Sequence, residues 1–254
     1  MIKITIIGYG NVAQHLIYAF QQNSDISIEQ VFTRQAAHNS FLNSTVNFIS
    51  QWEELVPADI FIVAVSDDSI AEVSGKIPLK NQLVVHTSGS ASLEQISSHN
   101  RRGVFYPLQT FTKGKLVDFK SIPICIETEF SADLEILKKL AQSISEKMHI
   151  INSTQRRALH VAAVFVNNFT NHMYTLGSEI CQENQVPFSI LESLIAETAS
   201  KITTVMPLEA QTGPAKRNDQ QTISTHLEFL KGNEMLHNIY QLLTQSIQNN
   251  GKEL

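Results

Sequence analysis

The chain opens with the stretch IKITIIGYGNVAQHLIYAF, residues 2–20. Its first part, IKITII, is rich in β-branched residues and ends at a glycine, which predicts a strand over residues 2–7. A Gly-x-Gly-x-x-Ala sequence follows, and Asn11 is placed to cap a helix that continues to about Gln22. A strand, a glycine turn and a helix in this order form either a cradle for a phosphate-bearing ligand or only a tight turn. The rest of the chain decides between the two.

Strands and helices alternate in the first half of the chain. Residues 58–65, ADIFIVAV, are almost all apolar, as in a strand buried on both faces of a sheet. Helices are predicted after Asp67 or Asp68, one of which would act as the cap, and over residues 131–145. Further strands are predicted at residues 27–34, 45–50, 82–89, 102–107, 122–127 and 146–152. This alternation predicts an α/β fold with a Rossmann-type, doubly wound parallel sheet.

The second part of the chain is predicted to be all-helical. Helical spacing begins after residue 152 and continues to Pro187, and no strand pattern follows. Helices are expected at residues 153–186, 187–202, 219–230 and 233–248. We therefore expect an α/β domain over residues 1–152 and an all-helical domain over residues 153–254.

The composition excludes several classes of protein. Hydrophobic residues make up 43% and charged residues 17% of the 254 residues, so a large core is possible and disorder is not expected. The net charge is -5 and no basic face is evident, so nucleic acid is not expected as a partner. No segment has the pattern of a membrane span or a metal site. The two cysteines fit no disulfide framework, which favours a cytoplasmic location.

The glycine motif stands in the context that dinucleotide binding requires. Gly8 would permit the tight turn, Gly10 would let the backbone approach a pyrophosphate, and Ala13 would allow close packing of helix on strand. The amides at the start of the helix would then face the anion. We therefore favour cofactor binding over a tight turn with no ligand.

The end of the second strand indicates which dinucleotide is bound. Proteins that prefer NAD usually carry a carboxylate there, whereas this chain has Thr33 and Arg34. Arg34 can bind a 2′-phosphate, so we predict NADP as the cofactor; otherwise Arg34 is a solvated surface residue. The complete set of predicted cofactor-binding residues is Gly8, Tyr9, Gly10, Asn11, Val12, Thr33, Arg34, Val65, Ser66 and Ser88.

Candidate residues for chemistry follow the strands and line the first long helix. His86 and Gln109 lie after the strands at 82–89 and 102–107, where open α/β sheets bind ligands, and are predicted to contact the substrate. On the long helix, Asn167 and Asn171 fall within about 20° of His160 at 100° per residue. These residues either form a structural polar seam or place His160 as an acid or base, with Asn167 or Asn168 orienting a substrate carbonyl or hydroxyl and Asn171 contacting the substrate.

The segment TGPAKRND, residues 212–219, is the third candidate region. Arg217 would bind an anionic substrate, or it would pair with Asp219 and fix the loop. The alternative is an ordinary loop leading into a helix, with Asp219 as the helix cap.

The segments IGYGNVA, HTSGS, YPLQTF, HVAAVFVNNF and TGPAKRND together resemble a family of bacterial Rossmann-like proteins with a C-terminal helical domain of unknown function. Members of this family are commonly labelled NADP oxidoreductases. The layout is more distantly similar to that of pyrroline-5-carboxylate reductase, the deazaflavin-dependent NADP oxidoreductases and the 3-hydroxyisobutyrate dehydrogenases. The resemblance implies a dinucleotide-binding domain over residues 1–152. It also implies a helical domain for substrate binding and dimerisation over residues 153–254, which completes the site, and a homodimer.

Two positions depart from the patterns of these families. The hydroxyisobutyrate group has a lysine four residues before an asparagine, where this chain has Ala163 before Asn167 and Val164 before Asn168. Asn218 stands where the resemblance leads us to expect glycine. We expect an NADP(H)-dependent oxidoreductase that transfers a hydride between the nicotinamide and a small anionic carbonyl, hydroxy or imine compound. The alternative is a dinucleotide-binding regulator or scaffold without catalysis.

Overall fold

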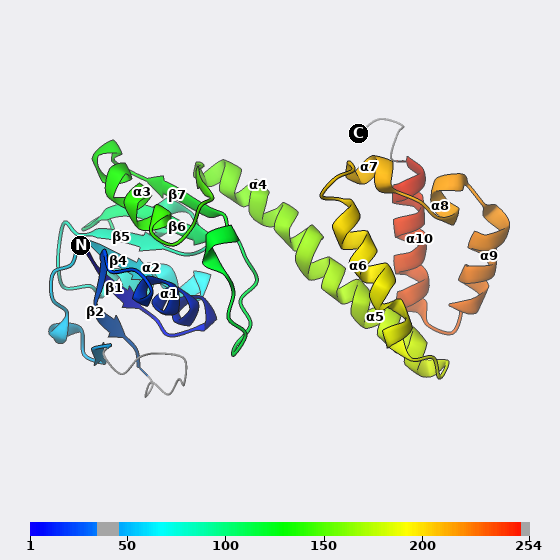
Figure 1. The fold of residues 1–254 in the computed structure, drawn as a ribbon, viewed down its shortest axis with the longest axis horizontal. Helices are drawn as coiled ribbons and strands as arrows, with labels where there is room; N and C mark the ends of the chain where they lie inside the picture. The colour runs from blue at the N-terminus through cyan, green and yellow to red at the C-terminus, as the bar shows by residue number, and fades with distance from the viewer. Residues whose placement is uncertain (35–45, 250–254) are drawn as a thin grey trace. The chain divides into compact units, whose positions relative to one another are not determined.

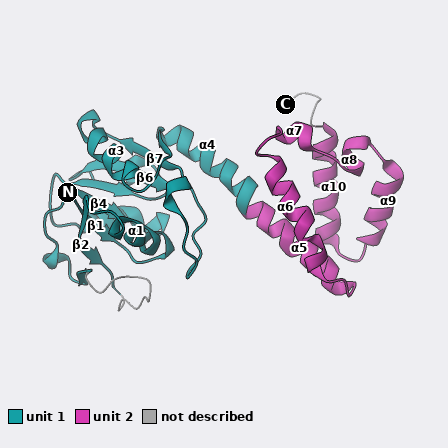
Figure 2. Cartoon of the chain, viewed as in Figure 1, with its two compact units in different colours: residues 1–167 teal, residues 168–254 magenta. Residues whose placement is uncertain are grey.

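The computed structural model describes residues 1–34 and 46–249 of the chain. The chain divides into two compact units, unit 1 over residues 1–167 and unit 2 over residues 168–254 (Figure 2). No helix among the described residues combines the length and the apolar character that are needed to cross a membrane.

Unit 1 is built on one sheet, to which eight strands of the described residues contribute (Figure 1). The strands lie in the order β3-β2-β1-β4-β5-β6-β7-β8. Their bounds are β1 Ile2–Ile7, β2 Ile26–Phe32, β3 Phe48–Ile49, β4 Ile60–Val63, β5 Leu83–His86, β6 Arg101–Pro107, β7 Ile124–Thr128 and β8 Met148–Ile150. The predicted strands are confirmed, although residue 45, the first of the predicted third strand, lies outside the described residues.

The two faces of the sheet carry different helices. The helices of unit 1 are α1 Asn11–Gln21, α2 Ile70–Gly75, α3 Leu134–Gln142 and α4 Ser153–Ala163. Ile4 and Ile6 of β1 belong to one apolar core with residues of α1 and α3, whereas Ile7 belongs to a second core with residues of α2. Successive side chains of a strand point to opposite faces, so β1 contributes to both cores. The sheet is therefore doubly wound.

Strand β7 departs from the parallel arrangement. It pairs antiparallel with β6, with Ile124 opposite Pro107, whereas the pairs from β3 to β6 and the β7–β8 pair are parallel. Parallel neighbours need a long crossover, usually a helix. Between β6 and β7 the chain forms only a short 3-10 turn, Phe119–Ser121, so the return to the sheet is antiparallel.

Two predicted helix caps are not used as caps. Helix α1 begins at Asn11 itself, and the Asn11 side-chain amide donates a hydrogen bond to the Phe111 carbonyl oxygen at 3.1 Å. The start of α2 has no side-chain cap, and Asp67 instead accepts a hydrogen bond from the Ser90 hydroxyl. Both side chains therefore tie neighbouring loops together at the carboxyl end of the sheet.

The long helix predicted from residue 153 changes character along its length. Helix α4 continues as a π-helix over Val164–Phe169 and then as α5 over Thr170–Glu183. A π-helix is wound through i→i+5 bonds rather than i→i+4 bonds. The predicted alignment of His160, Asn167 and Asn171 assumed a uniform 100° per residue, so it does not hold across this segment.

Unit 2 consists of helices in its described residues. Besides α5 they are a 3-10 helix, Phe188–Leu191, and α6 Glu192–Lys201, α7 Pro207–Ala210, α8 Pro214–Arg217, α9 Gln220–Phe229 and α10 Glu234–Asn249. The longer helices were predicted from spacing. The four-residue helices α7 and α8 were not, because such short elements have no measurable apolar period, although each begins with a proline, as helices often do.

The predicted boundary at residue 152 falls where α4 begins. Asn152 and Gln155 form a capping box at this point, in which each side chain accepts a hydrogen bond from the other residue's backbone N–H. The compact units divide later, between Asn167 and Asn168 in the π-helical segment. As a division between cofactor and substrate domains, the boundary at 152 stays a prediction.

Candidate functional site

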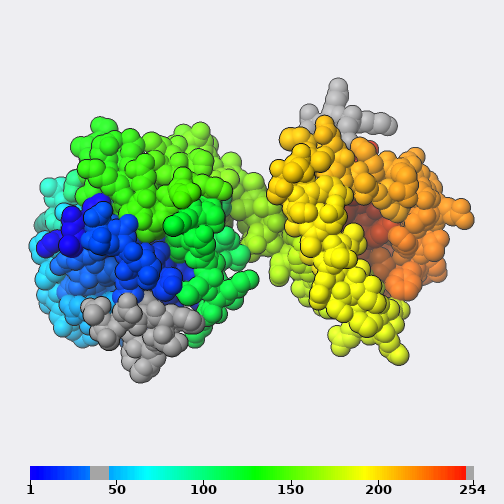
Figure 3. Space-filling model, viewed as in Figure 1, coloured from blue at the N-terminus to red at the C-terminus, as the bar shows by residue number. Residues whose placement is uncertain are grey.

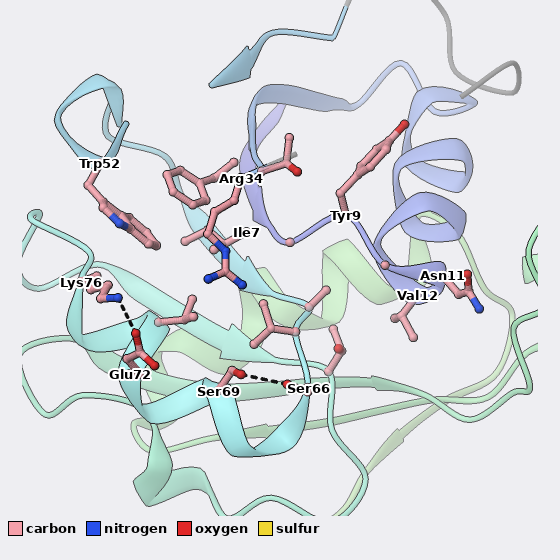
Figure 4. A pocket seen from close by; sticks show the side chains of 18 residues that line it. Ile7, Tyr9, Asn11, Val12, Arg34, Trp52, Ser66, Ser69, Glu72 and Lys76 are labelled. Carbon is pink, nitrogen blue, oxygen red and sulfur yellow. Dashed lines mark hydrogen bonds and ion pairs between the residues drawn. The ribbon is translucent and has the colours of Figure 1, made fainter. Parts of the chain in front are cut away.

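A cavity of about 810 Å³ opens in unit 1 at the carboxyl ends of its parallel strands. It is lined by segments that follow β1, β2, β4 and β5 and by residues of α2 (Figure 4). Strands β1 and β4 are neighbours in the sheet order, and the chain leaves them toward opposite sides. This is the switch point at which open α/β sheets bind ligands.

The glycine turn after β1 has the form of a phosphate cradle. Gly8 has a φ of +113°, and a Cβ built on it would lie 2.3 Å from the Ala64 carbonyl oxygen, so a larger residue does not fit. A Cβ on Gly10 would meet no atom within 4 Å, which shows that the turn is open on that side. Gly10 is the N-cap of α1, and the fully buried Ala13 brings this helix close to the strand. The cavity therefore fits the pyrophosphate of a dinucleotide.

Nine of the predicted cofactor-binding residues line this cavity together: Gly8, Tyr9, Gly10, Asn11, Val12, Thr33, Arg34, Val65 and Ser66. Ser88 does not line it. The Ser88 hydroxyl oxygen accepts hydrogen bonds from the backbone N–H groups of Ser90 at 3.1 Å and Ala91 at 2.9 Å, so this side chain shapes the loop after β5. Thr87, its neighbour, lines the cavity instead.

Charged side chains gather at the other end of the cavity. Figure 4 shows the Arg34 guanidinium group projecting toward the wall that carries Ser69 and Glu72. Glu72 of α2 forms an ion pair with Lys76, the C-cap of the same helix. The hydrogen bond and charge of Lys76 hold the pKa of the Glu72 carboxyl below its usual range, and Arg34 adds to this effect.

A second cluster lies beside the loop after β5. The Tyr106 hydroxyl at the end of β6 and Nδ1 of His160 on α4 are 3.2 Å apart. A Cβ on Gly89 would lie 2.5 Å from His160 Nδ1 and 2.7 Å from Tyr106 Cζ, so only glycine leaves room for this pair. Burial raises the pKa of Tyr106 to about 12, with a smaller contribution from Cys125. Tyr106 therefore remains a neutral phenol at physiological pH.

Helix α4 is fixed to the sheet by a buried arginine. Arg156 is fully buried and forms an ion pair with Glu127 of β7. It also donates hydrogen bonds to the Ala91 carbonyl oxygen at 2.6 Å and to the Ser153 hydroxyl at 3.3 Å. Because His160 follows Arg156 by one helical turn, this network sets where the His160 ring lies relative to Tyr106.

His86, predicted to bind the substrate, is fully buried at the end of β5. Its Nδ1 accepts a hydrogen bond from the Ser88 backbone N–H at 3.1 Å. Burial, assisted by the charge of Arg156, lowers the pKa of His86 to about 4. The ring is therefore neutral at physiological pH and supports the loop after β5 through its hydrogen bond with Ser88.

The remaining candidates lie in several parts of the chain. Gln109 is exposed after β6, and Asn167 is exposed in the π-helical segment of unit 1. Asn171 and Arg217 belong to unit 2, on α5 and at the end of α8. Asp219 accepts a hydrogen bond from the Thr222 backbone N–H at 3.1 Å, so it is the N-cap of α9, as the structural alternative for this loop predicted.

Sequence reasoning did not single out Trp52, Glu72 and Lys76 in the cavity, or Arg156 beneath the second cluster. The i,i+4 spacing of Glu72 and Lys76 predicts a pair on a helix but not its position in a cavity. Gly89 is part of the HTSGS segment, yet only the fold shows what it contacts.

Two family models match the sequence. The model described as "NADP oxidoreductase coenzyme F420-dependent" matches residues 3–89, and the one described as "Domain of unknown function (DUF2520)" matches residues 122–247. None of the curated proteins matches the sequence.

Solved structures match over nearly the whole chain. A Bacteroides fragilis protein assigned as an NADP oxidoreductase is 36% identical, with a TM-score of 0.86 and 98% of each chain covered. An imine reductase from Myxococcus stipitatus, solved with NADP+, is 15% identical, with a TM-score of 0.67 over 98% of this chain and 94% of the other. Pyrroline carboxylate reductase from Plasmodium falciparum, solved with NADP, is 18% identical, with a TM-score of 0.57 over 99% of this chain and 98% of the other. These last two share the fold.

The glycine cradle, the dinucleotide-sized cavity and the family model over residues 3–89 agree on an NADP-binding first part of the chain. With 36% identity over 98% of both chains, the protein belongs to the same family as the Bacteroides fragilis protein, the NADP oxidoreductases whose cofactor-binding part precedes a DUF2520 domain.

Proposed function

We propose that this NADP oxidoreductase transfers a hydride between the nicotinamide and a small anionic carbonyl, hydroxy or imine compound, with His160 exchanging the proton. The observation that carries the proposal is the 3.2 Å contact between His160 Nδ1 and the Tyr106 hydroxyl. This pair packs on Gly89, in the same loop as Thr87, which lines the cofactor cavity. A titratable ring therefore lies next to the loop that borders the cofactor.

The cofactor is held by residues of unit 1. Gly10 and the N-terminal amides of α1 would hold the pyrophosphate, and Thr33 with Arg34 would hold the 2′-phosphate. Val65 and Ser66 form the wall after β4. When bound, NADPH supplies the hydride. The absence of a carboxylate at the end of β2 supports a preference for NADPH over NADH.

His160 has two nitrogens with different tasks. In the imidazolium form Nδ1–H donates to the neutral Tyr106 oxygen, and Nε2–H is the transferable proton. Nε2 gives this proton to the substrate oxygen or nitrogen during reduction and takes it back during oxidation. The bond at Nδ1 is kept throughout, so the ring keeps its orientation while its charge changes.

Substrate contacts are assigned to the remaining candidates. Asn167 lies in the π-helical segment, a type of helix often found at functional sites, and would orient the substrate carbonyl or hydroxyl. Gln109 would be a further polar contact. The expected roles of Asn171 and Arg217 in substrate binding stay predictions, since both residues belong to unit 2. Because His86 is fully buried, we assign it to the support of the loop rather than to substrate contact.

The test is NADPH oxidation by the purified protein with a panel of small keto acids, aldehydes and cyclic imines. His160→Ala is expected to lower kcat by about 100-fold or more, the usual contribution of a general acid, while the protein still binds NADPH. The control is His149→Ala, which removes an exposed histidine of β8 and should leave kcat unchanged. Full activity of the His160→Ala variant would rule out the proposed role.

The second candidate is a dinucleotide-binding regulator or scaffold without catalysis. It is favoured by Ala163 and Val164, which stand where the resemblance to hydroxyisobutyrate dehydrogenases leads us to expect a lysine. A protein that binds NADPH but oxidises it with no compound of the panel would support this candidate. Turnover that His160→Ala abolishes would exclude it.

A homodimer through unit 2 forms part of the proposal. In the described residues of this unit, the buried hydrophobic residues are Ile223 and Leu236. Large apolar side chains are instead exposed, among them Ile190 before α6 and Leu194 on α6. Figure 3 shows the yellow α6 segment at the surface of unit 2. A second copy of the chain would cover such a surface. A cytoplasmic location is likewise inferred, from the two free cysteines.

A further inference from the structure

The charged end of the cofactor cavity contains more than the arginine after β2. The charged residues among those that line the cavity are Arg34, Glu72 and Lys76. They come from two separate segments, since Arg34 follows β2 whereas Glu72 lies on α2 and Lys76 is its C-cap. A carboxylate is thus present in a cavity that is proposed to bind a phosphate.

Lys76 is paired with this carboxylate. The Lys76 ammonium group forms an ion pair with a Glu72 oxygen, and Figure 4 shows both groups at the cavity wall. Arg34 acts on the same carboxylate, since its charge contributes to the lowered pKa of Glu72. Both cations therefore line the same cavity as this carboxylate.

We propose that Lys76 is a second ligand of the cofactor's 2′-phosphate, together with Arg34, and that Glu72 holds the Lys76 ammonium group in the cavity until the phosphate replaces it. The inference rests on the proposed cofactor and names a residue that determines its specificity. The two cations and one carboxylate leave one net positive charge. This charge attracts the 2′-phosphate dianion of NADPH but not the uncharged ribose 2′-hydroxyl that NADH has in its place.

Binding can be measured without turnover. Trp52 is the one tryptophan of the sequence and lines the cavity, so its fluorescence reports ligands that enter it. The probes are NADPH, NADH, adenosine 2′,5′-bisphosphate and adenosine 5′-monophosphate, each titrated against the full chain. The two adenosine nucleotides isolate the effect of the 2′-phosphate from that of the nicotinamide.

Lys76→Met is expected to raise the Kd of NADPH and of the bisphosphate about tenfold, the usual effect of losing a charge-assisted contact, and to leave NADH and the monophosphate unchanged. Glu72→Gln keeps an acceptor for Lys76 but removes the competing charge, so NADPH should bind more tightly. The control Lys80→Met removes a nearby exposed lysine that does not line the cavity and should change nothing. Added salt should weaken the binding of adenosine 2′,5′-bisphosphate less in Lys76→Met than in the parent protein.

Several outcomes would overturn the inference. One is a Lys76→Met variant that binds all four probes as the parent does, or that binds the probes with and without the 2′-phosphate more weakly by the same factor. Another is weaker NADPH binding in Glu72→Gln. If the parent protein binds none of the probes, the proposed function itself fails, which is a different result from an unchanged ratio of affinities in Lys76→Met.

Discussion

The buried imidazole of His86 makes stability depend on pH. Its pKa is lowered from 6.5 to about 4, so between these values the unfolded chain binds a proton that the folded chain does not. The free energy of unfolding should therefore fall as the pH is lowered through this range. From pH 7 to pH 5 the contribution of this group is about 2 kcal/mol.

His86→Asn tests this contribution. Asparagine can accept the hydrogen bond from the Ser88 N–H through its side-chain oxygen, but it does not titrate. Urea unfolding at pH 7 and pH 5 should show a smaller loss of stability in the variant than in the parent. Equal losses in both proteins would contradict the assignment.

At single positions, the sequence predicts residues whose role depends on local spacing. Gly8, Gly10 and Arg34 belong to a strand–turn–helix unit, and all three line the cavity. Lys76 reaches the same cavity from a segment far along the chain, and its position there depends on β1 and β4 being neighbours. The burial of His86 follows in the same way from the packing of whole elements. Neither could be read from the local sequence.

The attachment of α4 to the sheet depends on one ion pair. Arg156→Met would leave the Glu127 carboxylate, which the Ser153 N–H and hydroxyl also contact, without its cation in a largely buried site. Such a loss typically costs about 3–5 kcal/mol of stability. Since Arg156 also fixes the helix that carries His160, kcat should fall while the Kd of NADPH stays the same.

The neighbouring Arg157 provides the matched control, because it is on the same helix but exposed. Chemical denaturation, NADPH titration and steady-state kinetics should show Arg157→Met to be close to the parent protein. A stability of Arg156→Met within about 0.5 kcal/mol of the parent, the range of ordinary surface substitutions, would show that α4 is held by other contacts.

Among elements, the sequence predicts those with a clear period. The strand at Ile60–Val63 is apolar throughout because both of its faces are covered. The antiparallel direction of β7 could not be predicted in this way, because it depends on the connection from β6 and not on the strand's own residues. The π-helix at Val164–Phe169 could not be predicted either, because its residues have the same composition as those of an α-helix.

In the whole molecule, unit 2 is the part whose described residues bury little apolar surface. Ile190 is 65% exposed and Leu194 is 61% exposed, in a unit with few buried hydrophobic residues. Because a small helical domain is stable only when its apolar faces are covered, we expect the parent protein to be a homodimer. Light scattering should give twice the 28.4 kDa mass of the chain, and the unfolding temperature should rise with protein concentration.

Leu194→Glu is designed to place a charge in this interface. The variant should scatter as a single chain, or its unfolding temperature should drop and lose its concentration dependence, since a buried unpaired carboxylate strongly opposes association. Phe130→Glu is the matched control, because Phe130 is similarly exposed, at 51%, but lies in unit 1. If both variants remain dimers, the interface does not include Leu194. If the parent protein is itself monomeric at tens of micromolar, a dimer does not cover unit 2 and the proposed assembly fails.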